Sequence, residues 1–305
     1  MNGLNISLKG AAAYIRLYRG KTFVIKLGGK VLANPDFADA AAEQCALLSD
    51  LDIRVILVHG GGAQASDLSR NLGLEPKIIA GRRVTDDAAL EVVKMTYAGK
   101  VNVEMVSALR RHSVRAVGLT GIDAGLVLAN RRPPVVVRDD DGKEQLVDFG
   151  NVGDITRVDT GILTHLLEGG YMPAVSCLGA DEKGNPLNIN ADNIAEALAV
   201  ALQAKKLIFL TDQAGVLRDR NSPATLVPFA DAQDLAGLLE TGVISGGMRL
   251  KVEACIRAAT NGVKRTHIID GTAPFSLLME VFTGEGCGTM IVGEREKQIY
   301  QEEFK

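Results

Sequence analysis

Residues 23–32 read FVIKLGGKVL, a short apolar run that ends in a lysine and two adjacent glycines. An apolar run without alternation is typical of a strand buried on both faces of a parallel sheet. The pattern is not GxxxxGK[ST], because Lys26 precedes the glycines, and it is not GxGxxG. It predicts a strand that carries a lysine into a backbone turn, which is either a plain turn or one whose N–H groups face an anion.

The same strand-and-turn pattern recurs along the chain, in the stretches RVILVHGGG, VRAVGLTG, MPAVSCLG, KLIFLTD, RTHIIDG and TMIVG. Stretches of helical length and period lie between many of them, at 36–51, 86–111, 191–204 and 248–259. Strands that alternate with helices predict an α/β fold with a largely parallel sheet covered on both faces. Ligands of such sheets bind at the carboxyl ends of the strands.

Three segments depart from this alternation. The stretch PPVVVRDDDGKEQLVDFGNVGDITRVD (133–159) alternates in character and contains Asp141-Gly142, which predicts antiparallel hairpins inserted in a first lobe. The polar stretch DEKGNPLN (181–188) reads as a loop between two lobes. LKGAAAYIRLYRGK (8–21) reads as an extra amphipathic helix. The predicted division is an N-terminal helix at 1–20, a first lobe at 21–185 and a second lobe at 186–305.

Composition narrows the class of protein. The 305 residues are 47% hydrophobic, with a net charge of −3, which does not favour a nucleic-acid surface. No run approaches the ~18 apolar residues of a membrane span, and no secretory signal is evident, so a cytoplasmic protein is expected. The four cysteines form no CxxC pair, and packed reduced thiols are expected rather than metal ligands or disulfides.

A second glycine cluster, His59-Gly60-Gly61-Gly62, follows a buried-looking strand and precedes a helical pattern. Three glycines leave backbone amides open near a helix N-terminus, where a carboxylate or phosphate could bind, although a structural turn is an equal alternative. His59 invites a role as general base. A packed, hydrogen-bonded histidine is the favoured interpretation.

Four further residues have suggestive contexts. Arg83 precedes the Thr85-Asp86 capping pattern and could clamp a carboxylate, whereas an exposed arginine is the ordinary alternative. Lys251 lies near the start of a helix that follows Gly246-Gly247. Asn188 and Asp192 stand at the start of another helix, where capping explains part of the pattern but leaves Asn188 free to donate to a ligand.

These residue types suit one chemistry. Lysines, glycine amides and one aspartate, without a dedicated base, fit phosphoryl transfer to a carboxylate, which is already ionised at neutral pH. Catalysis then reduces to positioning and to neutralising charge on the transferred group. No Ser/His/Asp set, Cys/His set or zinc-like cluster appears in the sequence.

With its motifs in order, the chain resembles the amino-acid kinase family, and within it the N-acetyl-L-glutamate kinases. The resemblance spans about residues 20–292, through the segments KLGG, VHGGG, GRRVTDDAALEVVKM, GKVN, VGLTGID, LNINAD, LTDQAGVL, VISGGMRLKVEAC, HIIDG and GTMI. It implies a three-layer αβα sandwich with an acyl-amino-acid lobe and a nucleotide lobe. It also implies MgATP-dependent phosphorylation of the γ-carboxylate of N-acetyl-L-glutamate, the second step of arginine biosynthesis.

The resemblance assigns roles by position. Lys26 and Lys251 would stabilise the transferred phosphoryl group while Asp192 holds both lysines, and the metal would arrive with ATP. The acyl substrate would contact Gly61, Gly62, Arg83 and Asn188. Gly29 and Gly61 amides would touch phosphoryl oxygens, and the nucleotide would contact Gly29, Asp212, Gln213, Ala214, Gly215, Val216, Leu217, Val243, Ile244 and Ser245.

The resemblance also raises regulation and leaves alternatives open. Arginine-inhibited members carry a similar N-terminal helix, form dimers or hexamers, and bind arginine near the segment that here contains Glu280 and Gly286. The substrate could instead be N-acetylaminoadipate or N-succinylglutamate, or the chain could be a non-catalytic, arginine-sensing kinase-like domain. Lys30 replaces an Asn or Ser of many members and adds charge beside the first glycine turn.

Overall fold

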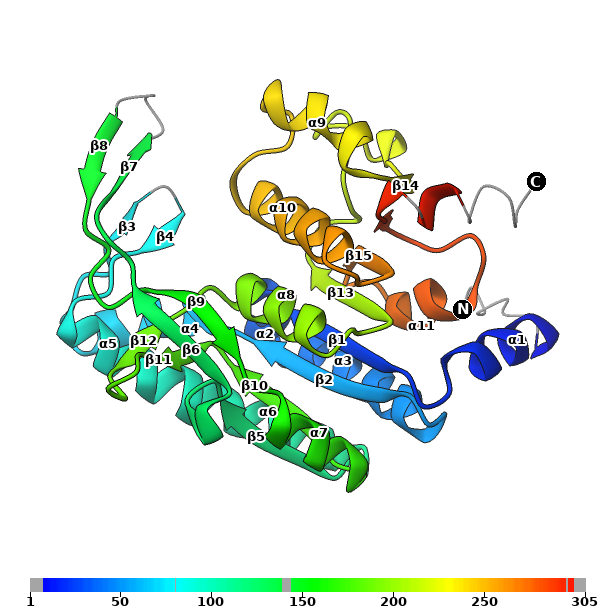
Figure 1. Ribbon diagram of the computed structural model, residues 1–305, viewed down its shortest axis with the longest axis horizontal. Coiled ribbons are helices and arrows are strands. Elements are labelled where there is room, and N and C mark those ends of the chain that lie inside the picture. The colour runs from blue at the N-terminus through cyan, green and yellow to red at the C-terminus, as the bar shows by residue number, and fades with distance from the viewer. Residues whose placement is uncertain (1–7, 80, 139–143, 295, 299–305) are drawn as a thin grey trace.

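The strand formed by Thr22–Leu27 lies in the middle of an eight-stranded sheet (Figure 1). The computed structural model describes residues 8–79, 81–138, 144–294 and 296–298. The sheet order is β14-β16-β15-β13-β1-β2-β10-β5. Its strands are β1 (Thr22–Leu27), β2 (Arg54–His59), β5 (Ala116–Thr120), β10 (Met172–Ser176), β13 (Lys206–Thr211), β14 (Phe229–Ala230), β15 (Arg265–Asp270) and β16 (Thr289–Ile291).

Every neighbouring pair in this sheet is parallel except β15 with β16, so the predicted largely parallel sheet is confirmed. All seven apolar stretches singled out in the sequence form strands of it. β1 is flanked by β2 and β13, and its side chains are buried from Phe23 to Leu27. A central parallel strand excludes water on both faces, which is why its sequence is continuously apolar.

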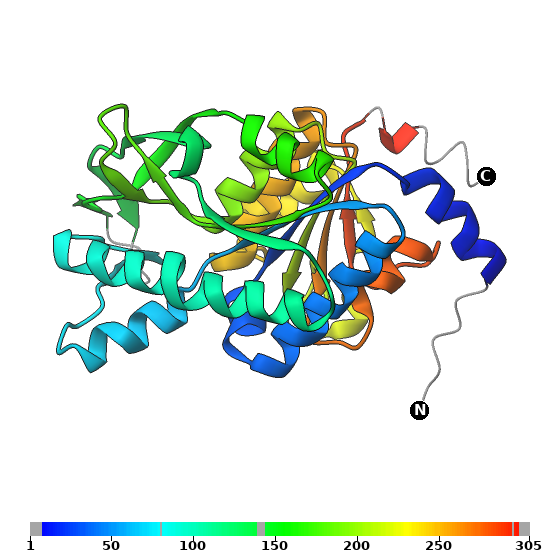
Figure 2. The same ribbon diagram turned by 90° about the horizontal axis from the view of Figure 1, so that it is seen from below.

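Helices cover both faces of the sheet (Figure 2). Alternate residues of β1 enter two separate cores: Val24 packs in the core that contains residues of α8 and α10, and Ile25 packs in the core that contains residues of α3, α6 and α11. The principal helices are α1 (Leu8–Tyr18), α2 (Gly29–Ala33), α3 (Pro35–Asp50), α4 (Gly62–Asn71), α5 (Asp87–Lys94), α6 (Asn102–Arg111), α7 (Gly161–Glu168), α8 (Ala191–Ala201), α9 (Ala232–Glu240), α10 (Gly246–Thr260) and α11 (Ser276–Phe282). This arrangement is the expected three-layer αβα sandwich.

The predicted helix at 86–111 contains an irregularity that the sequence did not reveal. Asp86 is its N-cap, and α5 and α6 are joined by a π-helical segment, η1 (Met95–Val101). Such segments are rare and often lie at functional sites. The helix at 191–204 ends earlier than predicted, at Ala201, and the helix at 248–259 is longer at both ends.

A second, four-stranded sheet and two hairpins project from the main sheet. The sheet runs β12-β11-β6-β9, and the hairpins are β3–β4 and β7–β8. Their bounds are β3 (Ile78–Ile79), β4 (Arg82–Arg83), β6 (Val127–Arg131), β7 (Val135–Arg138), β8 (Glu144–Val147), β9 (Gly153–Val158), β11 (Leu178–Ala180) and β12 (Pro186–Asn188). The antiparallel β7–β8 pair confirms the predicted insertion, and its predicted Asp141-Gly142 turn lies outside the described residues.

The predicted loop at 181–188 is partly wrong, because its last three residues form β12, which pairs antiparallel with β11. The predicted lobe boundary therefore falls inside a hairpin, and β1 of the first lobe pairs with β13 of the second. The division into lobes stays a prediction. The predicted N-terminal helix is confirmed as α1, which packs beside α11 at the margin of the molecule (Figure 1). No described helix is long and apolar enough to cross a membrane.

Candidate functional site

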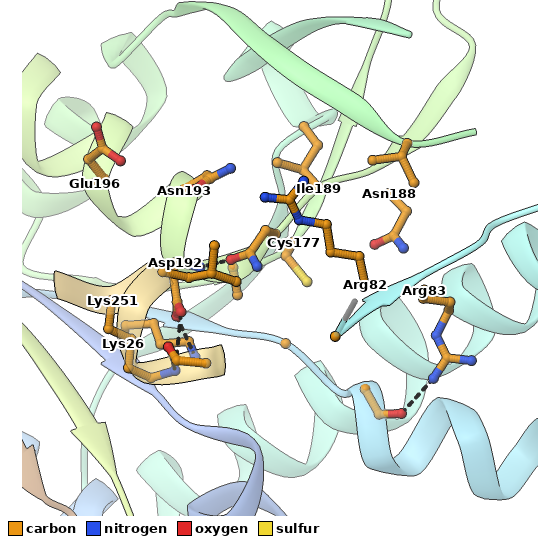
Figure 3. A pocket seen from close by; sticks show the side chains of 18 of the residues that line it. Lys26, Arg82, Arg83, Cys177, Asn188, Ile189, Asp192, Asn193, Glu196 and Lys251 are labelled. Carbon is orange, nitrogen blue, oxygen red and sulfur yellow. Dashed lines mark hydrogen bonds and ion pairs between the residues drawn. The ribbon is translucent and has the colours of Figure 1, made fainter. Parts of the chain in front are cut away.

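A cavity of about 740 Å³ lies at the carboxyl ends of β1 and β2 (Figure 3). Its walls come from β1, both glycine turns, β4, and the starts of α8 and α10. The carboxyl ends of neighbouring parallel strands meet at one edge of the sheet, which is why motifs far apart in sequence converge here. All seven residues named for catalysis and for the acyl substrate line this cavity: Lys26, Gly61, Gly62, Arg83, Asn188, Asp192 and Lys251.

Three charged side chains form the centre of the site. The Nζ of Lys26 on β1 lies 2.6 Å from one carboxylate oxygen of Asp192, and the Nζ of Lys251 on α10 lies 3.3 Å from the other. Asp192 stands in the first turn of α8, where the Asn190 side chain caps the helix by accepting the Asp192 N–H at 2.7 Å. Figure 3 shows both lysines directed at the same carboxylate.

The charge balance of this cluster favours an anionic ligand. Burial alone would raise the pKa of Asp192, but Lys26 and Lys251 together lower it below its ordinary value, so the carboxylate is ionised. One buried carboxylate shared by two ammonium groups leaves one positive charge uncompensated. Buried charge is costly unless it is paired, so the cluster is a ready-made site for a phosphoryl or carboxylate group.

The first glycine turn brings the end of β1 against β13. The Gly28 N–H donates to the Leu210 carbonyl oxygen at 2.7 Å, and a Cβ atom on Gly28 would lie 2.7 Å from that same oxygen. A side chain there would push the two strands apart, which is why this turn needs glycine. Gly29 begins α2 and lines the cavity.

The second glycine turn is packed against the π-helical segment. A Cβ atom on Gly61 would lie 2.8 Å from the Tyr97 ring, and α4 begins at the next residue, Gly62. The π-helix therefore places Tyr97 under the turn and leaves room only for backbone at Gly61. Tyr97 lines the cavity and was not identified from the sequence, because a single tyrosine inside a helical pattern carries no signal.

Arg83 is anchored rather than exposed. Its NH2 group donates to the Gly62 carbonyl oxygen at 2.8 Å and to the Ser66 Oγ at 2.6 Å, both on α4. These bonds hold the guanidinium beside the second glycine turn, and Arg83 also interacts with the Tyr97 hydroxyl, whose pKa it lowers against the larger raising effect of burial. None of these partners is charged, so none of them neutralises the positive charge of Arg83.

The sequence suggested that the Asn188 side chain is free, but in the structure it already has a hydrogen-bond partner. Its Nδ2 donates to the Thr85 Oγ1 at 3.0 Å, and the residue is buried at the end of β12. Thr85 lies two residues after Arg83, so the contact ties the wall that carries Asn188 to the strand that carries the arginine. The Asn188 Oδ1 and its second amide hydrogen remain able to meet a ligand in the cavity.

His59 is a packed histidine, which confirms the favoured interpretation. It is fully buried, its Nδ1 lies 3.1 Å from the Gly60 carbonyl oxygen, and burial lowers its pKa to about 4. A neutral, enclosed imidazole cannot exchange protons with a bound substrate through solvent. The four cysteines are free thiols, of which three are buried, and burial raises the pKa of each to about 12.

The predicted nucleotide segments lie beyond β13, and only Gly29 of that set lines the cavity. Val216 and Ile244 are buried in the core, so any ligand contact there would be made by backbone. Gly215 has a φ of +149°, and a Cβ atom on it would lie 2.5 Å from the Thr289 Oγ1. Arg220, which sequence reasoning missed, lies three residues after Leu217 and donates to the Val243 carbonyl oxygen and the Ser245 hydroxyl of the second segment.

Lys30 now has a partner. Its Nζ lies 2.5 Å from the Asp212 Oδ2, so the extra charge beside the first glycine turn is paired with the first residue of the nucleotide segment. The contact raises the pKa of Lys30, first through the hydrogen bond and then through the charge of Asp212. The Lys30 side chain is 78% exposed, and an ion pair so exposed contributes little to stability.

Glu280 and Gly286 lie together at a buried polar cluster outside the cavity. The Glu280 carboxylate lies 2.6 Å from the His267 Nδ1 and accepts the Cys287 N–H at 2.7 Å. A Cβ atom on Gly286 would lie 2.9 Å from that carboxylate. Burial would raise the pKa of Glu280, but His267 and the backbone N–H lower it to about 2. The His267 Nε2 lies 2.8 Å from the Lys206 Nζ, a link that the sequence pattern did not indicate.

The sequence of this chain matches known proteins over almost its whole length. The amino acid kinase family matches residues 21–270. An acetylglutamate kinase of Myxococcus xanthus is 45% identical over 96% of this chain and 95% of its own. An acetylglutamate kinase of Methanothermobacter thermautotrophicus is 42% identical over 95% of this chain and 99% of its own.

Solved structures agree with this match. The N-acetylglutamate synthase of Neisseria gonorrhoeae, complexed with coenzyme A and N-acetyl-glutamate, superposes with a TM-score of 0.79 at 31% identity. It covers 94% of this chain, which spans 62% of that longer chain. The carbamate kinase of Giardia lamblia, at 17% identity and a TM-score of 0.63, covers 90% of this chain and 99% of its own and shares the fold. The motifs, the sheet, the converging lysines and these matches lead to one conclusion: the chain belongs to the amino acid kinase family.

Proposed function

We propose that this protein uses ATP to phosphorylate the γ-carboxylate of N-acetyl-L-glutamate, giving the acyl phosphate and ADP in the second step of arginine biosynthesis. The observation that carries the proposal is the buried cluster in which Lys26 and Lys251 share Asp192. The full-length similarity to acetylglutamate kinases supports the same reaction. We also expect a cytoplasmic location, as the sequence predicts.

The reaction needs little more than positioning and charge. The acceptor carboxylate is already ionised, so no base must remove a proton. The transferred phosphoryl group would enter between Lys26, on β1, and Lys251, on α10, with Asp192 fixing the separation of the two ammonium groups. Backbone amides of Gly29 and Gly61 would donate to its oxygens. Donors held in place before the reaction stabilise developing charge without reorganisation.

The cavity suits a dianionic acyl amino acid. Its lining contains six cationic and four anionic side chains, so it carries a net charge of about +2 when all are ionised, as ordinary pKa values predict at neutral pH. N-acetylglutamate, with two carboxylates, has the complementary charge. Arg83 would hold the α-carboxylate, while Gly61, Gly62 and Asn188 would contact the rest of the substrate and leave the γ-carboxylate beside Lys26.

ATP would lie along the segments after β13 and before α10. Asp212 is the single carboxylate among the residues named for the nucleotide; Lys30 bonds one of its oxygens, and the Thr211 hydroxyl donates to the other at 3.2 Å. One carboxylate together with phosphate oxygens is an ordinary environment for Mg²⁺, so these residues fit a metal that is carried by the nucleotide. When bound, Mg²⁺ would neutralise charge on the phosphates. The chain's own contribution is the lysine cluster.

The alternatives are less well supported. N-acetylaminoadipate adds one methylene, which a pocket discriminates by only ~1–3 kcal/mol, and N-succinylglutamate adds a third carboxylate. The named relatives that match over nearly their whole length are acetylglutamate kinases. A purely arginine-sensing domain would not need the intact Lys26–Asp192–Lys251 cluster.

We further propose arginine as an effector and a homodimer or homohexamer as the assembly. A solved N-acetylglutamate synthase of Neisseria gonorrhoeae, 29% identical to this chain, is complexed with L-arginine. Glu280 and Gly286, the residues expected beside arginine, lie together, and α1 lies nearby against α11. For self-association, β5 is an edge of the main sheet, and the neighbouring Val103 is 62% exposed.

The direct test measures ADP release from ATP with N-acetylglutamate, N-acetylaminoadipate or N-succinylglutamate as acceptor, each with and without arginine. Turnover should be greatest with N-acetylglutamate and should fall when arginine is added. Absence of turnover with N-acetylglutamate would overturn the proposed reaction. Turnover that ignores arginine would overturn the effector alone.

A further inference from the structure

Arg82 is a charged side chain in the cavity that the proposed reaction does not use. It precedes Arg83 on β4 and is only partly exposed. Within the described ranges, no hydrogen bond or ion pair engages its guanidinium. Figure 3 shows the two arginines leaving β4 in different directions, with Arg82 extending across the cavity toward the wall that carries Ile189 and Asn193. Arg83 turns away from that wall to bond Gly62 and Ser66 on α4.

Of the two acidic residues whose charge acts on Arg82, Asp154 and Glu253, the first is already paired. Asp154 accepts three hydrogen bonds from Arg132, the shortest at 2.5 Å, so its charge is neutralised. Burial lowers the pKa of Arg82 most, and Arg132 lowers it further, whereas Asp154 and Glu253 favour its charged form. A partly buried guanidinium that lacks a bonded partner is costly, so Arg82 is poised to gain one.

Glu253 is an acidic residue that lines the same cavity as Arg82. It lies on α10, two residues after Lys251, and it lines the cavity from the wall opposite β4. Its Oε1 accepts the Nε of Arg249 at 2.8 Å, and the structure gives no partner for its Oε2 among the described residues. The side chain is 33% exposed, so its carboxylate can rotate toward the cavity.

We propose that Arg82 and Glu253 pair across the cavity when the substrates fill it, and that this ion pair positions the acceptor against the phosphoryl donor. The inference rests on the reaction proposed above. Arg82 directly precedes Arg83, which would hold the acyl substrate, and Glu253 lies on the helix that carries Lys251. Drawing the two residues together therefore brings the acyl wall and the phosphoryl wall together. Holding two reactants in attack geometry accelerates a reaction without new chemistry.

A double-mutant cycle tests the pair. The variants are Arg82→Gln, Glu253→Gln, both together, and the exchange Arg82→Glu with Glu253→Arg. Each single variant should lower kcat/KM by about 3–10-fold, the range of a coupled, partly buried charge pair. The kcat/KM of the double variant should not fall below that of the less active single variant. The exchange variant should recover at least half of the wild-type kcat/KM.

A second readout separates positioning from stability. Thermal unfolding is measured for each variant alone and with N-acetylglutamate plus a non-hydrolysable ATP analogue. The free proteins should unfold at similar temperatures, and the coupling should appear only in the ligand-bound set. Arg249→Gln is the matched control, because it removes the existing partner of Glu253 and should keep kcat/KM within about twofold.

Three results would overturn the inference in a wild-type protein that turns over. First, the losses in kcat/KM of the two single variants could multiply in the double variant, which would show that the two residues act independently. Second, Arg82→Gln could lower kcat/KM while Glu253→Gln behaves as wild type, which would assign Arg82 to the substrate itself. Arg249→Gln could also reproduce Glu253→Gln, which would assign the effect to α10. A wild-type protein without turnover on N-acetylglutamate would instead refute the proposed reaction.

Discussion

Replacing Asp192 by asparagine removes the charge that Lys26 and Lys251 share and preserves the shape of the side chain. The two Nζ–carboxylate distances are 2.6 and 3.3 Å. With an effective dielectric constant of about 20, they correspond to gross attractions of about 6 and 5 kcal/mol. Most of this is offset by the cost of burying the three charges. Removing one partner of a buried ion pair leaves a net loss of about 3–5 kcal/mol.

We expect the Asp192→Asn protein to unfold about 5–8 °C below the wild type, since an unfolding entropy of about 2.1 cal/mol/K per residue makes each kcal/mol worth about 1.6 °C in a chain of 305 residues. Without the carboxylate the two ammonium groups repel each other and leave the phosphoryl site. The value of kcat should therefore fall by about 10²–10³-fold. Calorimetry gives the first quantity, and coupled ADP release gives the second.

The matched control is Glu196→Gln, one turn further along α8. Glu196 also lines the cavity and pairs with Arg257, whose side chain is 47% exposed, so its loss should cost at most about 1 kcal/mol. The reasoning fails if Asp192→Asn is as stable and as active as Glu196→Gln. In that case the two lysines would not depend on Asp192 for their charge or their position.

The remaining predictions concern the lysine, the arginine and the buried histidine of the site. Lys251→Ala should lower kcat by about 10²-fold or more with an unchanged circular-dichroism spectrum, because one contact to the transferred group is lost; near-normal turnover would contradict its role. Arg83→Ala should mainly raise the KM for N-acetylglutamate, by about 10-fold or more, and leave the KM for ATP unchanged; an unaltered acyl KM would exclude the carboxylate clamp. Burial lowers the pKa of His59 in the folded protein to about 4, against an ordinary value of 6.5. As the pH falls below 6.5, the unfolded chain therefore binds a proton at His59 before the folded protein does. This difference makes the folded state less stable between pH 6.5 and 4, by up to about 3 kcal/mol at pH 4. His59→Gln should flatten the dependence of Tm on pH in that window, and an unchanged slope would show that His59 is not buried as a neutral group.

The regular part of the fold was predictable because it depends on local pattern. Continuous apolar runs such as that of β1 identify strands buried on both faces, and all seven were found in the main sheet. The short strands of the second sheet were not predictable in this way. β12 lies in a stretch rich in Asp, Gly, Asn and Pro, which local chemistry assigns to a loop, and it is a strand because β11 supplies its hydrogen-bond partners.

The helix at 86–111 shows the same limit. Its apolar period predicts its existence, and Asp86 predicts its start. The π-helical segment at Met95–Val101 has no local signature. It inserts Tyr97 beneath Gly61, a contact between two segments that lie far apart in the sequence.

The sequence by itself determined the class of sheet, the glycine turns, and the set of lysines and one aspartate that suits phosphoryl transfer. These features depend only on residue types and on their spacing over a few positions, which are the same in any conformation of the chain. The resemblance to a known family already implied that Asp192 holds Lys26 and Lys251, and the structure gives the two distances. Only the tertiary structure decided that Asn188 is tied to Thr85, that Lys30 is paired with Asp212, and that Arg82 extends over the cavity while Arg83 is anchored to α4. The partner of a charged side chain depends on which strands and helices pack together, and that information appears only when the separate segments meet at one edge of the sheet.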